Sequence, residues 1–285
     1  MKPSTSTLAL VNGQPSACVS LFDRGLAYGD GLFETLRIHA GKPVLAGLHW
    51  DRLQLGLERL AIPLTLGEVQ QQLQQLLRLA LSAGRSSGVV KLMVTRGDGL
   101  RGFAPPLEPQ PSVLLCWQEL PLIEPRQPLQ GRRLLSCRQR LPYRPWLAGL
   151  KHLNCLEYVL ARMELTPGAD VDGLLMDCDG RVIEATTSNL FVVTGGTLVT
   201  PALHRCGIMG TVRRWIIEEQ AGELHLPLVE ADLLPEEIHR ADEVFICNSV
   251  IGICPVSRID QWCWQPGPVT EAISSRFARM LDESD

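Results

Sequence analysis

The stretch Gly149-Leu-Lys-His-Leu-Asn-Cys-Leu-Glu-Tyr158 joins a turning segment of the chain to a helix and carries a lysine at the junction. Pro142, Pro145 and the leading glycine come just before Lys151, so the chain reaches this residue extended or turning. From about Asn154 onward, apolar residues recur at the spacing of an α-helix. A lysine at such a junction can be held by its backbone while its amine projects into a cleft. Most lysines instead lie solvated on the surface, so this stretch alone leaves both interpretations open.

Composition describes an ordinary globular protein. The chain has 285 residues, 45% of them hydrophobic and 20% charged, which is enough for one large or two ordinary domains. The formal net charge is -4 and no basic block stands out, so nucleic acid is not expected as a partner. The nine cysteines include no Cys-x-x-Cys pair, which favours reduced core residues in a cytoplasmic protein over disulfides or a metal site. With no secretory leader and no apolar run of about 18 residues, we expect no membrane segment.

The first part of the chain mixes strands with two helices. Apolar periodicity predicts amphipathic helices over residues 48–60 and 67–83. Alternation and turn residues predict strands over 7–11, 17–21, 33–39, 89–95 and 113–117. The glycine-rich run 23–31 requires a backbone that turns sharply or lies close to another group. We therefore expect a smaller mixed domain over residues 1–120.

A proline-rich segment at 119–130 divides the chain, with a predicted linker at 121–130. A larger second domain is expected over residues 131–285, and it includes Lys151. Strands are predicted there over 133–138, 173–177, 182–193, 242–247 and 250–256, and helices from about 154, over 212–220 and over 270–281. This organisation is that of a two-domain α+β or α/β protein.

The run Gly97-Asp-Gly-Leu-Arg-Gly102 matches the G-x-G-x-x-G pattern of dinucleotide-binding loops. That pattern indicates such a site only where the loop opens a helix. Here Pro105 and Pro106 follow, and two prolines cannot open the helix at the required place. We therefore exclude a dinucleotide site. Arg96 and Arg101 would suit a carboxylated substrate, although solvated loop arginines are an equally good interpretation.

Three polar segments of the second domain are candidates for binding. The run 184–189 interrupts an otherwise apolar strand pair, and buried polar groups need partners, which a cofactor would supply. The glycine-bearing loop 206–211 enters a helix, where free backbone donors suit a phosphate, or where a threonine simply caps the helix. Asn248 and Ser249 follow a strand, at a place where binding groups and turns are both common.

Together these segments supply a lysine, a distant carboxylate, a phosphate cradle and an arginine on a helix, which is what pyridoxal phosphate requires. Their order along the chain resembles that of the class IV (fold type IV) pyridoxal-phosphate enzymes, a family that includes branched-chain and D-amino acid aminotransferases and 4-amino-4-deoxychorismate lyase. The resemblance covers about residues 21–256. It is carried mainly by Arg24-Gly-Leu-Ala-Tyr-Gly-Asp-Gly-Leu-Phe-Glu34, Lys151-His-Leu-Asn154 and Glu184-Ala-Thr-Thr-Ser-Asn-Leu-Phe191.

The resemblance implies a pyridoxal 5'-phosphate enzyme of fold type IV that forms a homodimer and binds a small carboxylated substrate. Lys151 would bind the cofactor covalently and shuttle protons, and Glu184 would bind the pyridine nitrogen. Thr35 is a candidate for assisting proton transfer. The expected phosphate contacts are Arg52, Ile208, Met209, Thr211, Asn248 and Ser249. The expected substrate contacts are Tyr28, Arg96 and Arg101. No metal ligands are expected.

Within the family, the segment 151–162 is most similar to aminodeoxychorismate lyases, which release 4-aminobenzoate and pyruvate. Cys155 is a departure, because the usual lyase pattern has arginine after the asparagine. A D-amino acid aminotransferase would carry an Arg-x-His clamp where this chain has Arg101-Gly-Phe103. A branched-chain aminotransferase stays open as an alternative. A non-enzymatic protein that captures an acidic ligand through the loop 96–101 is an alternative of another class.

Overall fold

The computed structural model describes residues 8–99, 101–120, 131–166 and 171–283. The chain divides into two compact units. The first contains the described part of Met1–Pro121 together with Leu150–Asn154, and the second contains the described parts of Leu122–Gly149 and Cys155–Glu283. Lys151 is thus grouped with the first unit, whereas its place in the sequence suggested the second. The predicted linker 121–130 lies outside the described residues.

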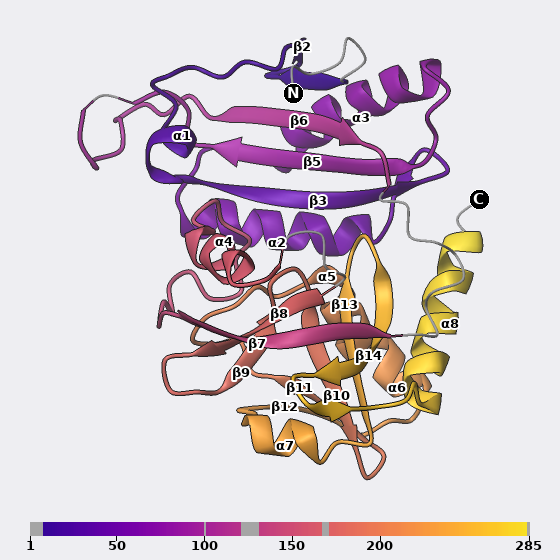
Figure 1. The fold of residues 1–285 in the computed structure, drawn as a ribbon. Helices are drawn as coiled ribbons and strands as arrows, with labels where there is room; N and C mark the ends of the chain where they lie inside the picture. Colours follow the sequence, from indigo (N-terminus) through magenta and orange to yellow (C-terminus); the bar gives the residue numbers. More distant parts are fainter. Residues whose placement is uncertain (1–7, 100, 121–130, 167–170, 284–285) are drawn as a thin grey trace. The chain divides into compact units, whose positions relative to one another are not determined.

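The first unit is built on a six-stranded antiparallel sheet of order β2-β1-β6-β5-β3-β4. Its strands are β1 Ala9–Val11, β2 Gln14–Pro15, β3 Gly31–His39, β4 Lys42–Pro43, β5 Gly88–Thr95 and β6 Ser112–Gln118. Its helices are α1 Arg24–Tyr28, α2 Ala46–Arg59 and α3 Leu66–Ser82. Figure 1 shows α2 and α3 on one face of the sheet.

The strand predicted over 17–21 is wrong. Asn12 and Gly13 both have positive φ angles, 49° and 75°, which suits a tight two-residue hairpin turn. Such a turn brings the returning strand in at once, so β2 forms at Gln14–Pro15. The other predicted strands and both helices of this unit are found within a few residues of their expected ends.

The core of the first unit lies between the sheet and its two helices. Leu32, Leu36 and Ile38 are buried on one face of β3, because alternate residues of a strand point to opposite faces. They pack with apolar residues of α2 and α3 in one cluster. Glu34 has the same strand parity and is therefore directed toward the helices, into an apolar layer where a carboxylate needs partners.

The second unit contains a nine-stranded mixed sheet, part of which closes on itself. Its strands are β7 Arg132–Leu141, β8 Val171–Asp177, β9 Val182–Ala185, β10 Asn189–Thr194, β11 Thr197–Pro201, β12 Leu228–Ala231, β13 Glu243–Asn248, β14 Gly252–Ile259 and β15 Trp262–Cys263. The order is β12-β11-β10-β13-β14-β7-β8-β9, with β15 on β14. An additional pairing of β9 with β10 closes the strands β10, β13, β14, β7, β8 and β9 into a ring.

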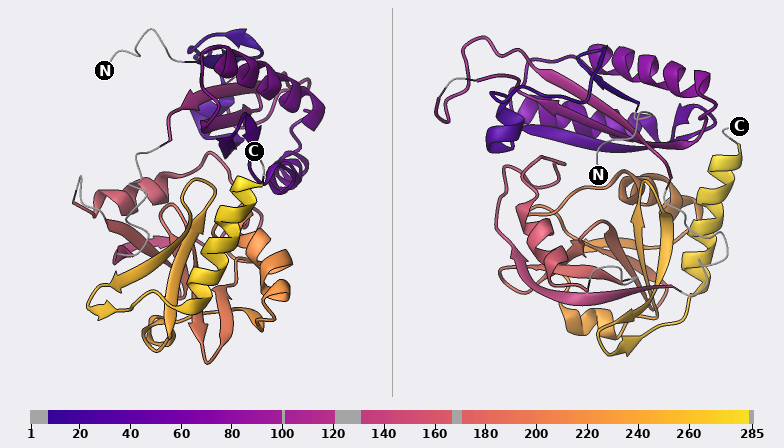
Figure 2. Two further views of the ribbon diagram at one scale, coloured as in Figure 1. Left: turned by 90° about the vertical axis from the view of Figure 1, so that its right-hand side faces the viewer. Right: turned by 45° about the horizontal axis from the view of Figure 1, so that its top comes forward.

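The helical elements of this unit are α4 Leu156–Met163, α5 Thr211–Trp215, the π-helical η2 Ile216–Gln220, α6 Ala221–Glu223, α7 Pro235–His239 and α8 Pro268–Asp282. Helix α8 packs along β13 and β14 (Figure 2). The single strand predicted over 182–193 is divided into β9 and β10 by the polar residues 186–188. β11, β12 and α7 were not expected from the sequence. None of the helices in the described ranges is long and apolar enough to cross a bilayer.

Candidate active site

Lys151 is held by backbone pairing with β3. The N–H of Phe33 donates to the carbonyl oxygen of Lys151 (2.8 Å), and the N–H of Leu153 donates to that of Gly31 (3.0 Å). β4 pairs only with the last residues of β3. The segment Leu150–Asn154 lies along the same edge of β3, next to the first residues of that strand. The Nζ atom of Lys151 lies 4.3 Å from the centre of the Phe33 ring. These hydrogen bonds fix the main chain of Lys151, from which its side-chain amine extends. A reactive lysine needs such a fixed position.

A second lysine faces the same ring, although the sequence did not single it out. The Nζ atom of Lys91 on β5 lies 4.5 Å from the centre of the Phe33 ring. In the sheet register, Lys91 is paired with Thr35. All three residues therefore share the sheet face opposite α2 and α3. Strand parity could have grouped them only if the pairing of β3 with β5 had been known.

Arg52 belongs to a buried cluster with Glu34 and His49. Nε of Arg52 donates to Oε1 of Glu34 (2.8 Å), and Nη2 donates to Oε2. Nδ1 of His49 lies 2.6 Å from Oε2. Burial acts to raise the pKa of Glu34, but the adjacent Arg52 and His49 outweigh it and hold that pKa at about 2. Glu34 is therefore an anion that orients the Arg52 guanidinium.

His49 is the neutral member of this cluster. Burial lowers its pKa more than the Glu34 carboxylate raises it, and the cations of Arg52 and Lys151 lower it further. An ionised carboxylate can only accept hydrogen bonds, so the ring proton of His49 is on Nδ1, which donates to Glu34. The cluster thus carries one anion and one fixed cation at neutral pH.

The side chain of Arg96, a predicted substrate contact, forms hydrogen bonds to other residues of the first unit. Its guanidinium donates to both carboxylate oxygens of Asp30 (2.8 and 3.0 Å) and to the carbonyl oxygens of Leu60 (2.7 Å) and Ala61 (2.9 Å). Burial acts to raise the pKa of Asp30, but hydrogen bonds from Arg96 and Arg24 outweigh it and keep the pKa below its ordinary value. Arg96 therefore joins the glycine-rich run to the end of α2, which differs from the predicted contact with substrate.

The other two predicted substrate contacts reach solvent. The ring of Tyr28 lies 5.4 Å from that of Phe103, and the guanidinium carbon of Arg24 lies 5.0 Å from the Tyr28 ring centre. Tyr28 is 37% exposed, and Arg101 is exposed in the loop that follows Gly99. Both side chains stay candidates for contact with a substrate.

In the second unit, Glu184 is a buried carboxylate with three neutral hydrogen-bond donors. The Tyr158 hydroxyl donates to Oε1 (2.6 Å), Nδ2 of Asn189 donates to Oε2 (3.2 Å), and the N–H of Ile208 lies 3.1 and 3.2 Å from the two oxygens. Glu184 is only 3% exposed and is paired with Asn189 where the strand ring closes. Buried carboxylates need such donors, which here also fix the orientation of the group. Sequence reasoning missed the roles of Tyr158 and Asn189, and only Asn189 lay in a polar run that could have signalled one.

The loop predicted to bind phosphate uses two of its backbone donors internally. The N–H of Ile208 is bound to Glu184, and the N–H of Met209 donates to the carbonyl oxygen of Gly149 (3.1 Å). These bonds differ from the predicted phosphate contacts of Ile208 and Met209. They place the loop against the Glu184 carboxylate and against Gly149.

The helix start that follows is the part of this loop best suited to an anion. Gly210 is the N-cap of α5, so no side chain caps this helix, and its own N–H donates to Oδ1 of Asn189 (3.0 Å). The helical run Thr211–Glu223 therefore begins with backbone donors that a phosphate can accept from. Thr211 and, after β13, Ser249 stay predicted phosphate contacts.

The side chain of Asn248 has a structural role in the second unit. Its Nδ2 donates to the carbonyl oxygen of Thr187 and to Oγ of Ser188, both at 3.1 Å. Its Oδ1 accepts from the N–H groups of Val250 and Ile251, both at 2.9 Å. The side-chain amide therefore ties the turn after β13 to the polar run, which differs from the predicted phosphate contact.

The middle of the polar run is satisfied within the protein. The hydroxyls of Thr186 and Thr187 both donate to the carboxylate of Asp172, the second at 2.8 Å. These two hydroxyls therefore need no cofactor as a hydrogen-bond partner. Only the two ends of the run, Glu184 and Asn189, belong to the candidate site.

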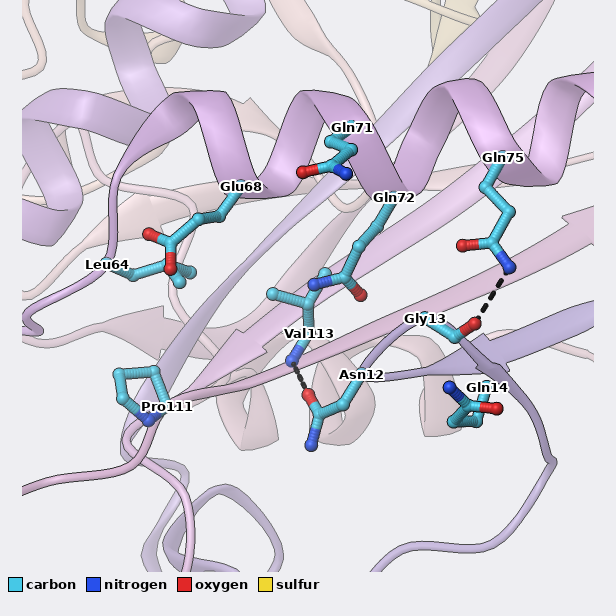
Figure 3. Close-up of a pocket in the computed structure, with 10 residues that line it drawn as sticks. All are labelled: Asn12, Gly13, Gln14, Leu64, Glu68, Gln71, Gln72, Gln75, Pro111 and Val113. Carbon is cyan, nitrogen blue, oxygen red and sulfur yellow. Dashed lines mark hydrogen bonds between the residues drawn. The ribbon is translucent and has the colours of Figure 1, made fainter.

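A polar hollow of about 450 Å³ on the first unit contains none of these residues. It lies between α3, the β1–β2 turn and the start of β6 (Figure 3), and β5 separates these strands from β3. Its polar groups hold the turn in place, since Oδ1 of Asn12 accepts from the N–H of Val113 and Nε2 of Gln75 donates to the Gly13 carbonyl. We interpret it as a structural hollow.

Comparison with known proteins identifies the family. The model of the amino-transferase class IV family matches residues 31–259, which is more than half of the chain. The chain belongs to the amino-transferase class IV family. The predicted resemblance and the predicted fold type IV are thereby confirmed.

Several members of the class IV family are similar over nearly their whole length. An aminodeoxychorismate lyase of Vibrio harveyi is 34% identical over 262 residues, which cover 87% of this chain and 90% of the relative. The crystal structure of 4-amino-4-deoxychorismate lyase from Pseudomonas aeruginosa is 46% identical, with a TM-score of 0.90, and the match covers 96% of this chain and 99% of that one. The crystal structure of the T.th. branched-chain amino acid aminotransferase with pyridoxamine 5'-phosphate is 25% identical, with a TM-score of 0.82 and coverage of 96% and 93%.

Proposed function

We propose that this class IV protein is a pyridoxal-phosphate-dependent aminodeoxychorismate lyase that converts 4-amino-4-deoxychorismate to 4-aminobenzoate and pyruvate for folate synthesis. The observation that carries the proposal is the 46% identity to the P. aeruginosa lyase structure over 96% of the chain. Homodimer formation and a cytoplasmic location are part of the same proposal; membership of the family supports the first, and the reduced-cysteine pattern supports the second.

The residues present fit the cofactor. Pyridoxal phosphate needs an amine for its carbonyl carbon, an acid for its ring nitrogen and donors for its phosphate. Lys151 supplies an amine on a backbone fixed by β3, and Glu184 supplies a buried carboxylate held by neutral donors. Arg52 and the uncapped start of α5 supply a cation and backbone N–H groups.

When bound, the cofactor would supply an electron sink for the charge that develops as the substrate loses a proton. Lys151 would accept that proton from the ring carbon that carries the amino group. The bond between the ring and the enolpyruvyl oxygen would then break and the ring would become aromatic. The departing enolpyruvate would take up a proton at its methylene carbon, which balances the proton passed to Lys151, and would leave as pyruvate. Lys91 and Arg101 offer cations for the two carboxylates of this substrate.

An aminotransferase of branched-chain amino acids is the second candidate, because the T.th. branched-chain enzyme shares the fold at a TM-score of 0.82. The two activities would use the same cofactor contacts and differ in the substrate. The second cation beside Phe33 favours a substrate with two carboxylates over an apolar amino acid.

The deciding experiment supplies aminodeoxychorismate to the yellow holoprotein without any keto acid. We expect 4-aminobenzoate and pyruvate in equal amounts, and none from Lys151→Ala. Borohydride reduction followed by peptide mapping is expected to label Lys151. Transamination of branched-chain or D-amino acids with 2-oxoglutarate, without any lyase product, would overturn the proposal. A colourless protein whose acidic-ligand binding survives Lys151→Ala would instead indicate a binding protein.

A further inference from the structure

The hydroxyl of Tyr158 makes a short hydrogen bond to Glu184. It donates to Oε1 at 2.6 Å, whereas the Asn189 and Ile208 donors lie at 3.1 Å or more. Burial and the Glu184 carboxylate raise the pKa of Tyr158 well above its ordinary value. The phenol therefore keeps its proton and acts as a permanent donor.

The ring and the hydroxyl of Tyr158 have separate surroundings. The ring packs against a buried cluster made up of Cys137, Leu141, Ala161, Leu175, Ile183, Leu203 and Cys206. The hydroxyl alone reaches Glu184. Removal of the hydroxyl can therefore leave the packing of α4 on the sheet intact while it removes one donor from the carboxylate.

A donor to a carboxylate stabilises its charged form and makes the group a weaker base. If Glu184 shares a proton with the ring nitrogen of a bound cofactor, the two groups compete for it. Fewer donors on Glu184 move that proton toward the carboxylate. More donors keep it on the ring nitrogen, where it strengthens the electron-withdrawing character of the ring.

We propose that Tyr158 is a positioning residue that orients Glu184 and lowers its affinity for a proton, so that the shared proton stays on the ring nitrogen of the cofactor. This inference rests on the proposed function, because it requires the cofactor to be bound at Glu184. Tyr158 acts only through Glu184 and needs no contact with the substrate.

The test compares wild type, Tyr158→Phe and Tyr143→Phe, each loaded with pyridoxal phosphate labelled with ¹⁵N in the ring. Tyr143 is the matched control, because it is 66% exposed. In Tyr158→Phe we expect the ¹⁵N signal to move toward the position of an unprotonated ring and kcat to fall about tenfold, with a smaller change in KM. Wild type and Tyr143→Phe are expected to share the signal of a protonated ring.

The possible results are distinguishable. If Tyr158→Phe keeps the wild-type ¹⁵N signal while the wild type makes 4-aminobenzoate, this inference fails and the proposed function stands. The same holds if the variant loses only thermal stability, since a purely structural tyrosine would behave in that way. Wild-type protein that binds no labelled cofactor would overturn the proposed function, and this inference with it.

Discussion

Replacement of Glu34 by glutamine tests whether the ionic cluster under α2 stabilises the first unit as the geometry indicates. Glu34 accepts hydrogen bonds from Arg52 and His49 and is 1% exposed. The substitution removes the negative charge but nearly keeps the shape of the side chain. Arg52 then loses the ion pair with Glu34, and loss of one partner of a buried pair is strongly destabilising.

The magnitude follows from the pKa of Glu34. This pKa is about 2 in the folded protein, against 4.5 for the free side chain. The difference of about 2.5 units, at about 1.4 kcal/mol per unit, gives roughly 3 kcal/mol of stability at neutral pH. This agrees with the roughly 3–5 kcal/mol expected for a broken buried pair. Because the folded pKa is depressed, the contribution is complete above pH 4.5 and disappears as the pH falls through about 2.

The assay is urea unfolding of wild type and Glu34→Gln between pH 7 and pH 2. The variant is expected to be less stable by about 3 kcal/mol at pH 7, and the gap should narrow below about pH 4.5. The control is Glu58→Gln, an exposed position on α2 whose carboxylate accepts from Gln54, for which a change within about 0.5 kcal/mol is expected. A gap below about 1 kcal/mol, or one that does not narrow in acid, would refute the reasoning.

Two further substitutions test the sheet of the first unit and the cation beside the candidate site. Gly31→Ala would place a Cβ 2.3 Å from the carbonyl oxygen of Val94, so we expect the free energy of unfolding, measured in urea, to fall by roughly 1–3 kcal/mol. Gly47→Ala is the control, because a Cβ at that position has no atom within 4 Å. Equal stability of the two variants would contradict this expectation. In steady-state kinetics, Lys91→Met should raise the KM for aminodeoxychorismate about tenfold or more, while the holoprotein keeps its colour. An unchanged KM would exclude a role of Lys91 in substrate binding.

Most helices and strands could be predicted because the spacing of their apolar residues is visible within a short stretch of sequence. The spacing of apolar residues placed α2, α3 and α8 within a few residues of their observed ends. The strand at 17–21 failed because a two-residue turn at Asn12 leaves no room before the returning strand. Short edge strands such as β12, with four residues, carry too little pattern to be distinguished from loops.

The candidate site was predictable only in part, because a sequence shows which groups can donate but not whether their donors are already used. Lys151 and Glu184 stood out by their motifs. Arg96 and Asn248 also looked like ligands, yet their hydrogen bonds hold loops together in this fold. Lys91 gave no local signal, since only the pairing of β3 with β5 brings it to the ring of Phe33.

The pairing of Glu184 with Asn189 links the fold of the second unit to its candidate chemistry. These two residues make the contact at which β9 meets β10 and the strand ring closes. The same two side chains bind each other and the loop before α5, through Ile208 and Gly210. The position of the carboxylate is therefore set by the closure of the sheet and not by a flexible loop. Burial of this polar pair costs desolvation free energy, and the hydrogen bonds of the pair offset that cost only while the strand ring is closed. Opening of the ring and loss of the orientation of the Glu184 carboxylate should therefore occur together.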